Sequence, residues 1–180
     1  MVNSLEFELP DQRYQEAARM LGTADETKRV EARKAVLAAG KEALPVLVNL
    51  LANGNKQARL EAASALGTLR DKEAAPALVR ALENEDHDVR WAVRKALINL
   101  GRDGLEPLLI ALMHAFDCIW LREGAHYILN DLKKQGELRP PLLKVLHALE
   151  GIEPAFAAPW AAEKAWEVLF GPRRTGNKNA

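Results

Sequence analysis

The stretch DKEAAPALVRALENEDHDVRWAVRKALINLG, residues 71–101, decides the fold, because its landmarks recur along the chain. Its proline recurs at a constant interval, at Pro45, Pro76 and Pro107. An arginine in its second half recurs at nearly the same interval, at Arg29, Arg59, Arg90 and Arg122. Repeats with a period of about 20–50 residues cannot bury their apolar faces alone, so they stack and present an extended surface. The sequence therefore predicts a stacked-repeat domain.

The composition favours helices throughout. Hydrophobic residues make up 48% of the chain and are mostly the helix formers alanine and leucine, whereas strand-forming residues are few. The 25 basic and 25 acidic side chains balance, so no net charge attracts the chain to nucleic acid or to an anionic membrane. With Cys118 as its single cysteine, and without a signal peptide or a membrane-length apolar run, the chain is expected to be cytoplasmic.

The periodicity predicts an all-α chain with helices at about residues 11–21, 26–39, 42–53, 57–69, 72–84, 88–100, 104–115, 119–134, 140–149 and 160–170. Asp11, Asp71 and Asp103 are predicted to cap helices, and the repeated prolines to fall in or just after a first turn. Pro159 is expected to precede the last helix. Residues 1–10 are predicted to be a lead, 11–170 a single domain with a C-terminal cap, and 171–180 a disordered basic tail.

The segments QARLEAASALGTL (residues 57–69) and DVRWAVRKALINLG (residues 88–101) each follow a proline-containing helix such as DKEAAPALVRALENED. These segments resemble HEAT repeats, most closely the short bacterial kind found in phycobilisome-lyase-like proteins. The resemblance covers residues 26–134 well. It implies a right-handed α-solenoid of stacked antiparallel helix pairs, with about four to five repeats and a concave surface lined by the second helix of each pair.

Counting from the repeated arginine separates buried positions from exposed ones on these second helices. Offsets +3, +6, +7 and +10 from the arginine are apolar in every repeat and predict a buried seam that includes Leu97. Offsets +1, +2, +5 and +9 are expected to face the groove, where Glu31, Glu61 and Glu123 would lie. Trp120, Trp160 and Trp166 are expected to pack in the core or the cap.

A binding site is predicted where aromatic and basic side chains concentrate, in the third and fourth repeats. It consists of Trp91, Arg94, Lys95, His126 and Tyr127. Two alternatives stay open here: Trp91 fills a gap between repeats, or His126 is a hydrogen-bonded structural residue. The repeated arginines are predicted to bind acids in a ladder that fixes the stacking, with Arg59, Arg90, Arg122, Asp86 and Asp117 as its members.

No catalytic motif emerges from the sequence. None of the four histidines is followed by glutamate, so the His-Glu iron sites of hydroxylases built from similar repeats are missing, and no catalytic residue, metal site or cofactor is predicted. The predicted function is a non-enzymatic protein-binding module or scaffold, whose partner is an acidic or amphipathic helical segment. Two alternatives remain: handling of a bilin or other tetrapyrrole in the manner of a lyase or chaperone, and DNA binding or alkylpurine-glycosylase-like activity.

Overall fold

The computed structural model of the chain describes residues 10–114 and 117–171. All regular structure in these two ranges is helical: α1 (Pro10–Leu21), α2 (Glu26–Ala39), η1 (Gly40–Ala43), α3 (Leu44–Asn53), α4 (Lys56–Leu69), η2 (Lys72–Ala74), α5 (Ala75–Ala81), α6 (His87–Leu100), α7 (Arg102–His114), α8 (Ile119–Lys134), α9 (Pro140–Glu150) and α10 (Pro154–Phe170). The predicted all-α class is therefore confirmed. The predicted disordered tail and most of the lead lie outside the described residues.

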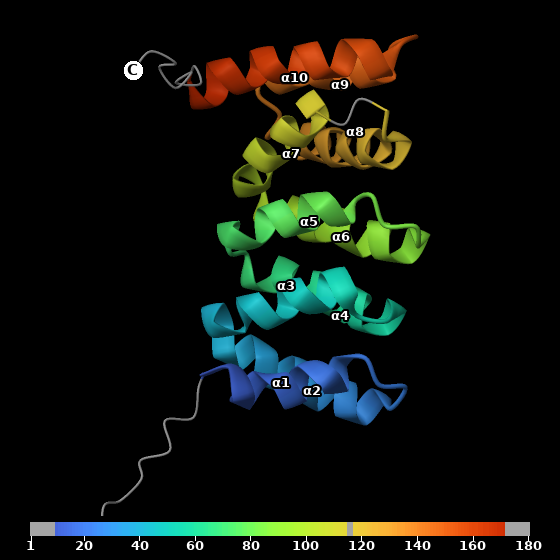
Figure 1. The fold of residues 1–180 in the computed structure, drawn as a ribbon. Helices are drawn as coiled ribbons and strands as arrows, with labels where there is room; N and C mark the ends of the chain where they lie inside the picture. Colours follow the sequence, from blue (N-terminus) through green and yellow to red (C-terminus); the bar gives the residue numbers. More distant parts are fainter. Residues whose placement is uncertain (1–9, 115–116, 172–180) are drawn as a thin grey trace, which may run out of the picture. The chain divides into compact units, whose positions relative to one another are not determined.

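The chain divides into two compact units, Met1–Leu100 and Gly101–Ala180, and each is described by itself. The single domain predicted for residues 11–170 stays a prediction, as does the handedness of the stack. In the first unit, α1 packs on α2, α3 on α4 and α5 on α6, and Figure 1 shows these three pairs as successive layers. The second helices of neighbouring pairs also contact each other, since α2 packs on α4 and α4 on α6.

The buried seam of the second helices follows the predicted register from α4 onward. Leu66 on α4, Val93 and Leu97 on α6, and Ile128 and Leu129 on α8 are all buried. The first repeat departs from this pattern, because Ala35 on α2 is exposed and Ala39 is only half-buried. The repeat period therefore located every seam residue correctly in the third and fourth repeats, and all but Leu69, which is half-buried, in the second.

Polar caps define several helix ends in the first unit. Asp25 caps α2 by accepting hydrogen bonds from the backbone N–H groups of Thr27 and Lys28. The predicted cap at Asp71 is confirmed, because its carboxylate accepts from the N–H of Glu73 at the start of η2. The predicted caps at Asp11 and Asp103 are wrong. Each aspartate lies one residue inside a helix, since α1 begins at Pro10 and α7 at Arg102.

The repeated prolines occupy two different helical positions. Pro45 and Pro76 lie in the first turn of α3 and α5, each after a short 3-10 turn, where no hydrogen bond is lost. Pro107 lies inside α7, because that helix begins five residues before the proline without a preceding 3-10 turn. At this position the ring removes the hydrogen bond that would reach the carbonyl of Asp103.

In the second unit, α7 packs on α8, α8 on α9, and α10 on both α9 and α7. The predicted start of the last helix is wrong, because α10 begins at Pro154 and continues through Pro159. Pro154 occupies the first turn, which favours helix initiation there. The helix thereby gains more than one turn, which carries Phe156 and Ala158.

One helical run, Glu26–Asn53, is long and apolar enough to cross a membrane by length and composition. It is two helices rather than one, because Gly40 has a φ of 60° and introduces the 3-10 turn η1 between α2 and α3. Both helices pack on neighbouring helices of the first unit. This run is therefore weak grounds for a membrane span.

Candidate functional site

Trp91 and Lys95 form an exposed pair on α6 in the first unit. They are separated by one helical turn, so their side chains share a face, and the Lys95 Nζ lies 5.7 Å from the centroid of the Trp91 ring. The Trp91 side chain is 51% exposed, whereas Val93 and Leu97 on the opposite face are buried. Arg94 is half-buried beside them. Here α6 presents an indole ring with an ammonium group above it, which is a cation–π contact.

The other two residues of the predicted site, His126 and Tyr127, lie on α8 in the second unit. Both are half-buried. The His126 Nε2 atom lies 3.4 Å from an Oε1 atom of Glu150 at the end of α9. The five predicted site residues thus belong to two separately described units, and their assembly into one site stays a prediction.

Two of the repeated arginines bind the turn that precedes their own helix. Arg29 Nη1 donates to the carbonyl oxygens of Thr23 at 2.8 Å and Ala24 at 2.7 Å. Arg90 Nη1 donates in the same way to the carbonyls of Asn84 at 2.7 Å and Glu85 at 2.9 Å. In both repeats the acceptors lie six and five residues before the arginine. The guanidinium therefore satisfies carbonyls that the preceding helix and turn leave without helical partners.

The other members of the predicted ladder lie on different helices and turns. Arg59 and Arg122 are half-buried, and Asp117 is exposed. Asp86 lies at the turn before α6, 2.9 Å from Lys56 Nζ, and its carboxylate also accepts from the backbone N–H groups of Asp88 and Val89. The pairing of the repeated arginines with Asp86 or Asp117 stays a prediction.

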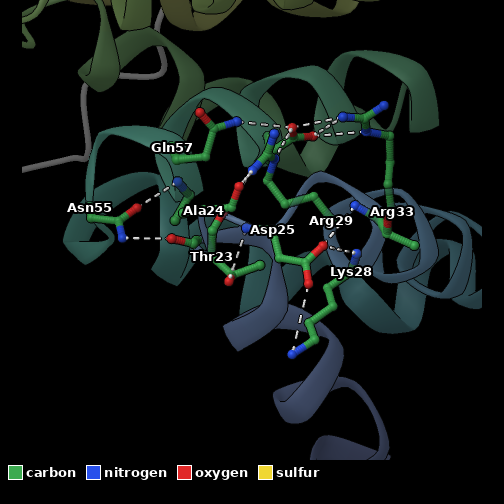
Figure 2. A network of polar contacts seen from close by, with 12 residues as sticks. Thr23, Ala24, Asp25, Lys28, Arg29, Arg33, Asn55 and Gln57 are labelled. Carbon is green, nitrogen blue, oxygen red and sulfur yellow. Dashed lines mark hydrogen bonds and ion pairs between the residues drawn. The ribbon is translucent and has the colours of Figure 1, made fainter.

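An acid at the centre of the first unit binds arginine from the preceding repeat (Figure 2). Glu61 on α4 accepts hydrogen bonds from Arg33 Nε at 2.8 Å and from Arg33 Nη2 at 2.7 Å, which is a bidentate pair. Arg29 Nε lies 3.8 Å from the same carboxylate, and Gln57 Nε2 donates to it at 3.1 Å. The prediction that Glu61 faces the groove is wrong, because this residue is only 6% exposed. The arginines of α2 cover its charge.

Two lysines make further bridges between repeats of the first unit. Lys56 at the start of α4 reaches two acids of the next repeat, with Nζ 2.9 Å from Asp86 and 2.6 Å from Asp88. These hydrogen bonds raise the pKa of Lys56 and hold the pKa of each aspartate below its usual value. In the same unit, Lys41 Nζ lies 3.0 Å from the buried carboxylate of Asp71.

The pKa of Asp71 is lowered by the hydrogen bond from the Glu73 backbone N–H and then by Lys41, while the pKa of Lys41 is raised by the hydrogen bond to Asp71. None of these lysine bridges was expected from the sequence. The signal that could have found them is the spacing. Lys41 precedes Asp71 by the same interval as Lys56 precedes Asp86, and this interval is close to one repeat.

Asn55 joins two turns of the first unit. Its side-chain oxygen accepts from the backbone N–H of Ala58 and so caps α4. Its side-chain nitrogen donates to the carbonyl oxygen of Gly22, at the end of α1, at 2.9 Å (Figure 2). The same amide therefore begins one helix and anchors the turn of the preceding repeat.

Each of the two units contains a small cavity. One of about 300 Å³ in the second unit is lined by Arg102, Leu105, Leu132, Glu137, Arg139, Leu142, Leu169 and Phe170. One of about 230 Å³ in the first unit lies between α3 and α5, where Val48, Leu51, Ala77 and Arg80 line it. Within residues 10–114 and 117–171, no three His, Cys, Asp or Glu side chains come together as a group that could hold a metal ion.

Exposed aromatic side chains contradict part of the predicted core. Trp160 on α10 is 67% exposed and Trp120 at the start of α8 is also exposed, so the prediction that they pack inside is wrong for both. Trp160 points outward because the buried face of α10 is occupied by alanines. Trp166 is half-buried, and its ring lies tilted beside Phe170 with centroids 6.2 Å apart.

Comparison with known proteins identifies the repeat. A family model described as HEAT repeats matches residues 10–97 and, in a second overlapping match, residues 44–125. No curated protein and no solved structure matches the chain. The narrower likeness to phycobilisome-lyase-like proteins stays a prediction.

Proposed function

The chain belongs to the HEAT-repeat family, and from this premise we propose that it is a non-enzymatic scaffold that binds another protein on a surface centred on Trp91. HEAT repeats are repeat scaffolds that commonly mediate protein–protein interactions. The observation that carries the proposal is the half-exposed indole of Trp91 beneath the Lys95 ammonium. Tryptophan beside a cation is typical of interface residues that dominate binding energy, because burial of the large ring excludes water from the contact.

The ammonium group of Lys95 beside Trp91 favours an acidic partner. Lys34 on α2 is a second exposed lysine on the second helices of the first unit. Of the acids expected on this side of the unit, Glu61 is buried against Arg33, whereas Glu31 on α2 is exposed. An amphipathic helical segment with acidic residues would bury its apolar side on Trp91 and place carboxylates near the lysines. We therefore propose this class of partner, with the cytoplasm as the compartment where the two meet.

The test compares capture by the wild-type chain with capture by the double variant Trp91→Ala/Arg94→Glu. Protein captured from a native lysate is identified by mass spectrometry, and its affinity for each variant is then measured by calorimetry. The double variant should lose at least tenfold in affinity. Trp91→Ala alone should also weaken binding, with little change in melting temperature, because half of the Trp91 surface is exposed to solvent. Unchanged affinity would place the binding surface elsewhere.

A matched control removes an exposed tryptophan from the other unit. Trp160→Ala deletes an indole that is exposed to a similar degree but lies on α10, so it should leave the affinity unchanged. An absorbance spectrum of the purified chain and a gel-shift assay at low salt address the two alternatives. A visible pigment band would favour tetrapyrrole handling, and a shifted nucleic acid would favour DNA binding.

A further inference from the structure

Three large apolar side chains of α10 lie on its solvent face. Phe156 is 77% exposed, Trp160 is 67% exposed and Val168 is 71% exposed, whereas the fully buried side chains of the face packed on α7 and α9 are alanines, with Trp166 and Leu169 half-buried. The buried alanines are Ala158, Ala161, Ala162 and Ala165. A surface helix ordinarily shows the opposite arrangement, with its bulky apolar residues turned inward. The outer face of α10 therefore has the composition of a surface that is covered by another molecule.

The exposed residues form one continuous row. Phe156, Trp160, Lys164 and Val168 follow one another at intervals of four residues, so they lie along a single ridge of the helix. Ridges of this kind are the elements that interdigitate when two helices pack. The row is symmetric about Ala162, since Phe156 and Val168 lie six positions on either side and Trp160 and Lys164 lie two positions on either side.

We propose that α10 packs antiparallel against α10 of a second copy of the chain, with the twofold axis crossing the solvent face of the helix at the level of Ala162, whose own side chain points inward. In this arrangement Phe156 of one copy contacts Val168 of the other, and the Trp160 ring lies against Lys164 of the other. The second contact is a cation–π pair that forms twice because of the symmetry. Each aromatic side chain of the row therefore contacts an aliphatic or a cationic side chain of the second copy.

The charges of α10 agree with this pairing. Lys164 Nζ already lies 2.9 Å from Glu167 of its own helix, and the hydrogen bond to this carboxylate raises the pKa of the lysine. About the same axis, Glu167 faces the exposed Ala157 of the second copy, and the position that mirrors Glu163 is the inward-facing Ala161, so no two acids meet. Within α10, Glu163 and Glu167 outnumber Lys164, whereas Arg173 and Arg174 follow the helix, so charge alone does not separate a second copy from an anionic membrane and the vesicle experiment below does.

The apolar area suits a weak dimer. Aromatic side chains bury about 150–250 Å² each, so two from each copy together with Val168 approach the roughly 1,000 Å² at which specific interfaces begin. The monomer and the dimer should therefore exchange with concentration.

The experiment measures the mass of the full chain by light scattering from about 1 µM to about 300 µM, a range chosen because small interfaces give weak dimers. The wild type should shift from monomer to dimer, and Trp160→Glu should remain monomeric with an unchanged melting temperature. Trp91→Glu, which removes an exposed indole from α6, should dimerise like the wild type. A wild type that stays monomeric throughout, or a Trp160→Glu variant that still dimerises, would overturn the proposal.

Cross-linking tests the antiparallel register without altering the row. In a Cys118→Ser background, Ala157→Cys and Glu167→Cys occupy positions that face each other across the axis. The mixture of the two variants should form a disulfide-linked dimer faster than either variant alone. Linkage that is faster within one variant than between the two would overturn the antiparallel pairing. Sedimentation with phosphatidylserine vesicles that depends on Trp160, in a chain that stays monomeric, would assign the face to a membrane instead.

Discussion

Gly67 on α4 and Ala96 on α6 are in direct backbone contact across two neighbouring repeats. A Cβ atom placed on Gly67 would lie 2.7 Å from the Cα and 2.9 Å from the Cβ of Ala96. No side chain larger than a hydrogen atom fits at this position, and both residues are buried. The distance between the second helices of the two repeats is therefore set by a glycine.

Gly67→Ala should destabilise the chain although alanine is the better helix former. The added methyl must push α4 away from α6, which costs about 1–3 kcal/mol, and the gain in helix propensity returns only about 1 kcal/mol. Urea unfolding measures the difference. Ser64→Ala, an exposed change on the same helix, should alter the unfolding free energy by less than about 0.5 kcal/mol. A Gly67→Ala variant as stable as the wild type would contradict the close approach.

Glu61→Gln should lower the free energy of unfolding by about 1–3 kcal/mol, because it leaves Arg33 without its anionic partner near the core. The partial exposure of Arg33 keeps the cost below that of a fully buried pair. Arg33→Lys should cost less, since one hydrogen bond to the carboxylate survives. Glu31→Gln, an exposed acid on α2, is the control and should be nearly neutral. Equal effects of Glu61→Gln and Glu31→Gln would mean that the pair of Arg33 and Glu61 does not stabilise the fold.

Arg90→Met should destabilise the turn between α5 and α6 by about 1.5–3 kcal/mol, because the carbonyls of Asn84 and Glu85 lose a charged donor. Hydrogen exchange of the amides at the start of α6 should accelerate more than exchange in α2. Arg80→Met, at an exposed arginine of α5, serves as the comparison and should leave both rates unchanged. Uniform acceleration across the unit would point to a global role for Arg90 instead.

The bridges of Lys56 predict a loss of stability in acid. Asp86 and Asp88 have lowered pKa values in the folded chain, so their contribution is present above the ordinary aspartate pKa of about 3.9 and disappears as the pH falls through the folded values. The melting temperature of Lys56→Gln should therefore be lower than that of the wild type at pH 6, and this difference should become smaller as the pH falls toward 3. Melting curves across this range test the prediction. Lys34→Gln is the control and should show no such dependence on pH. A difference in melting temperature between Lys56→Gln and the wild type that grows in acid would contradict the prediction.

Substitutions of the exposed tryptophans on α6 and α10 should change the stability of the monomer less than substitution of the buried Glu61. Removal of Trp91 or Trp160 should leave the melting temperature of the monomer within about 2 °C, because exposed side chains contribute little to the core. Thermal melts at low concentration test this. A large decrease for either variant would show that the indole packs inside the fold.

The sequence by itself determined the helices and the seam. The bounds predicted for α2 and α8 agree with the structure, and Leu97 is buried as its offset from Arg90 predicts. The helix bounds and the seam depend on the local periodicity of apolar residues, which recurs in each repeat at a nearly constant interval. Residues close together in the sequence are therefore sufficient to predict them. The same signal placed Trp91 on an exposed face.

Only the tertiary structure decided which polar side chains meet and which large side chains point outward. Glu61 is buried because Arg33, 28 residues earlier, reaches it across the gap between α2 and α4. Trp160 is exposed because α10 turns its alanines toward α7 and α9, and helical periodicity alone does not say which of two apolar faces packs inward. Both outcomes depend on contacts between segments distant in the chain, where the space left by neighbouring helices and the charge available there select the partner.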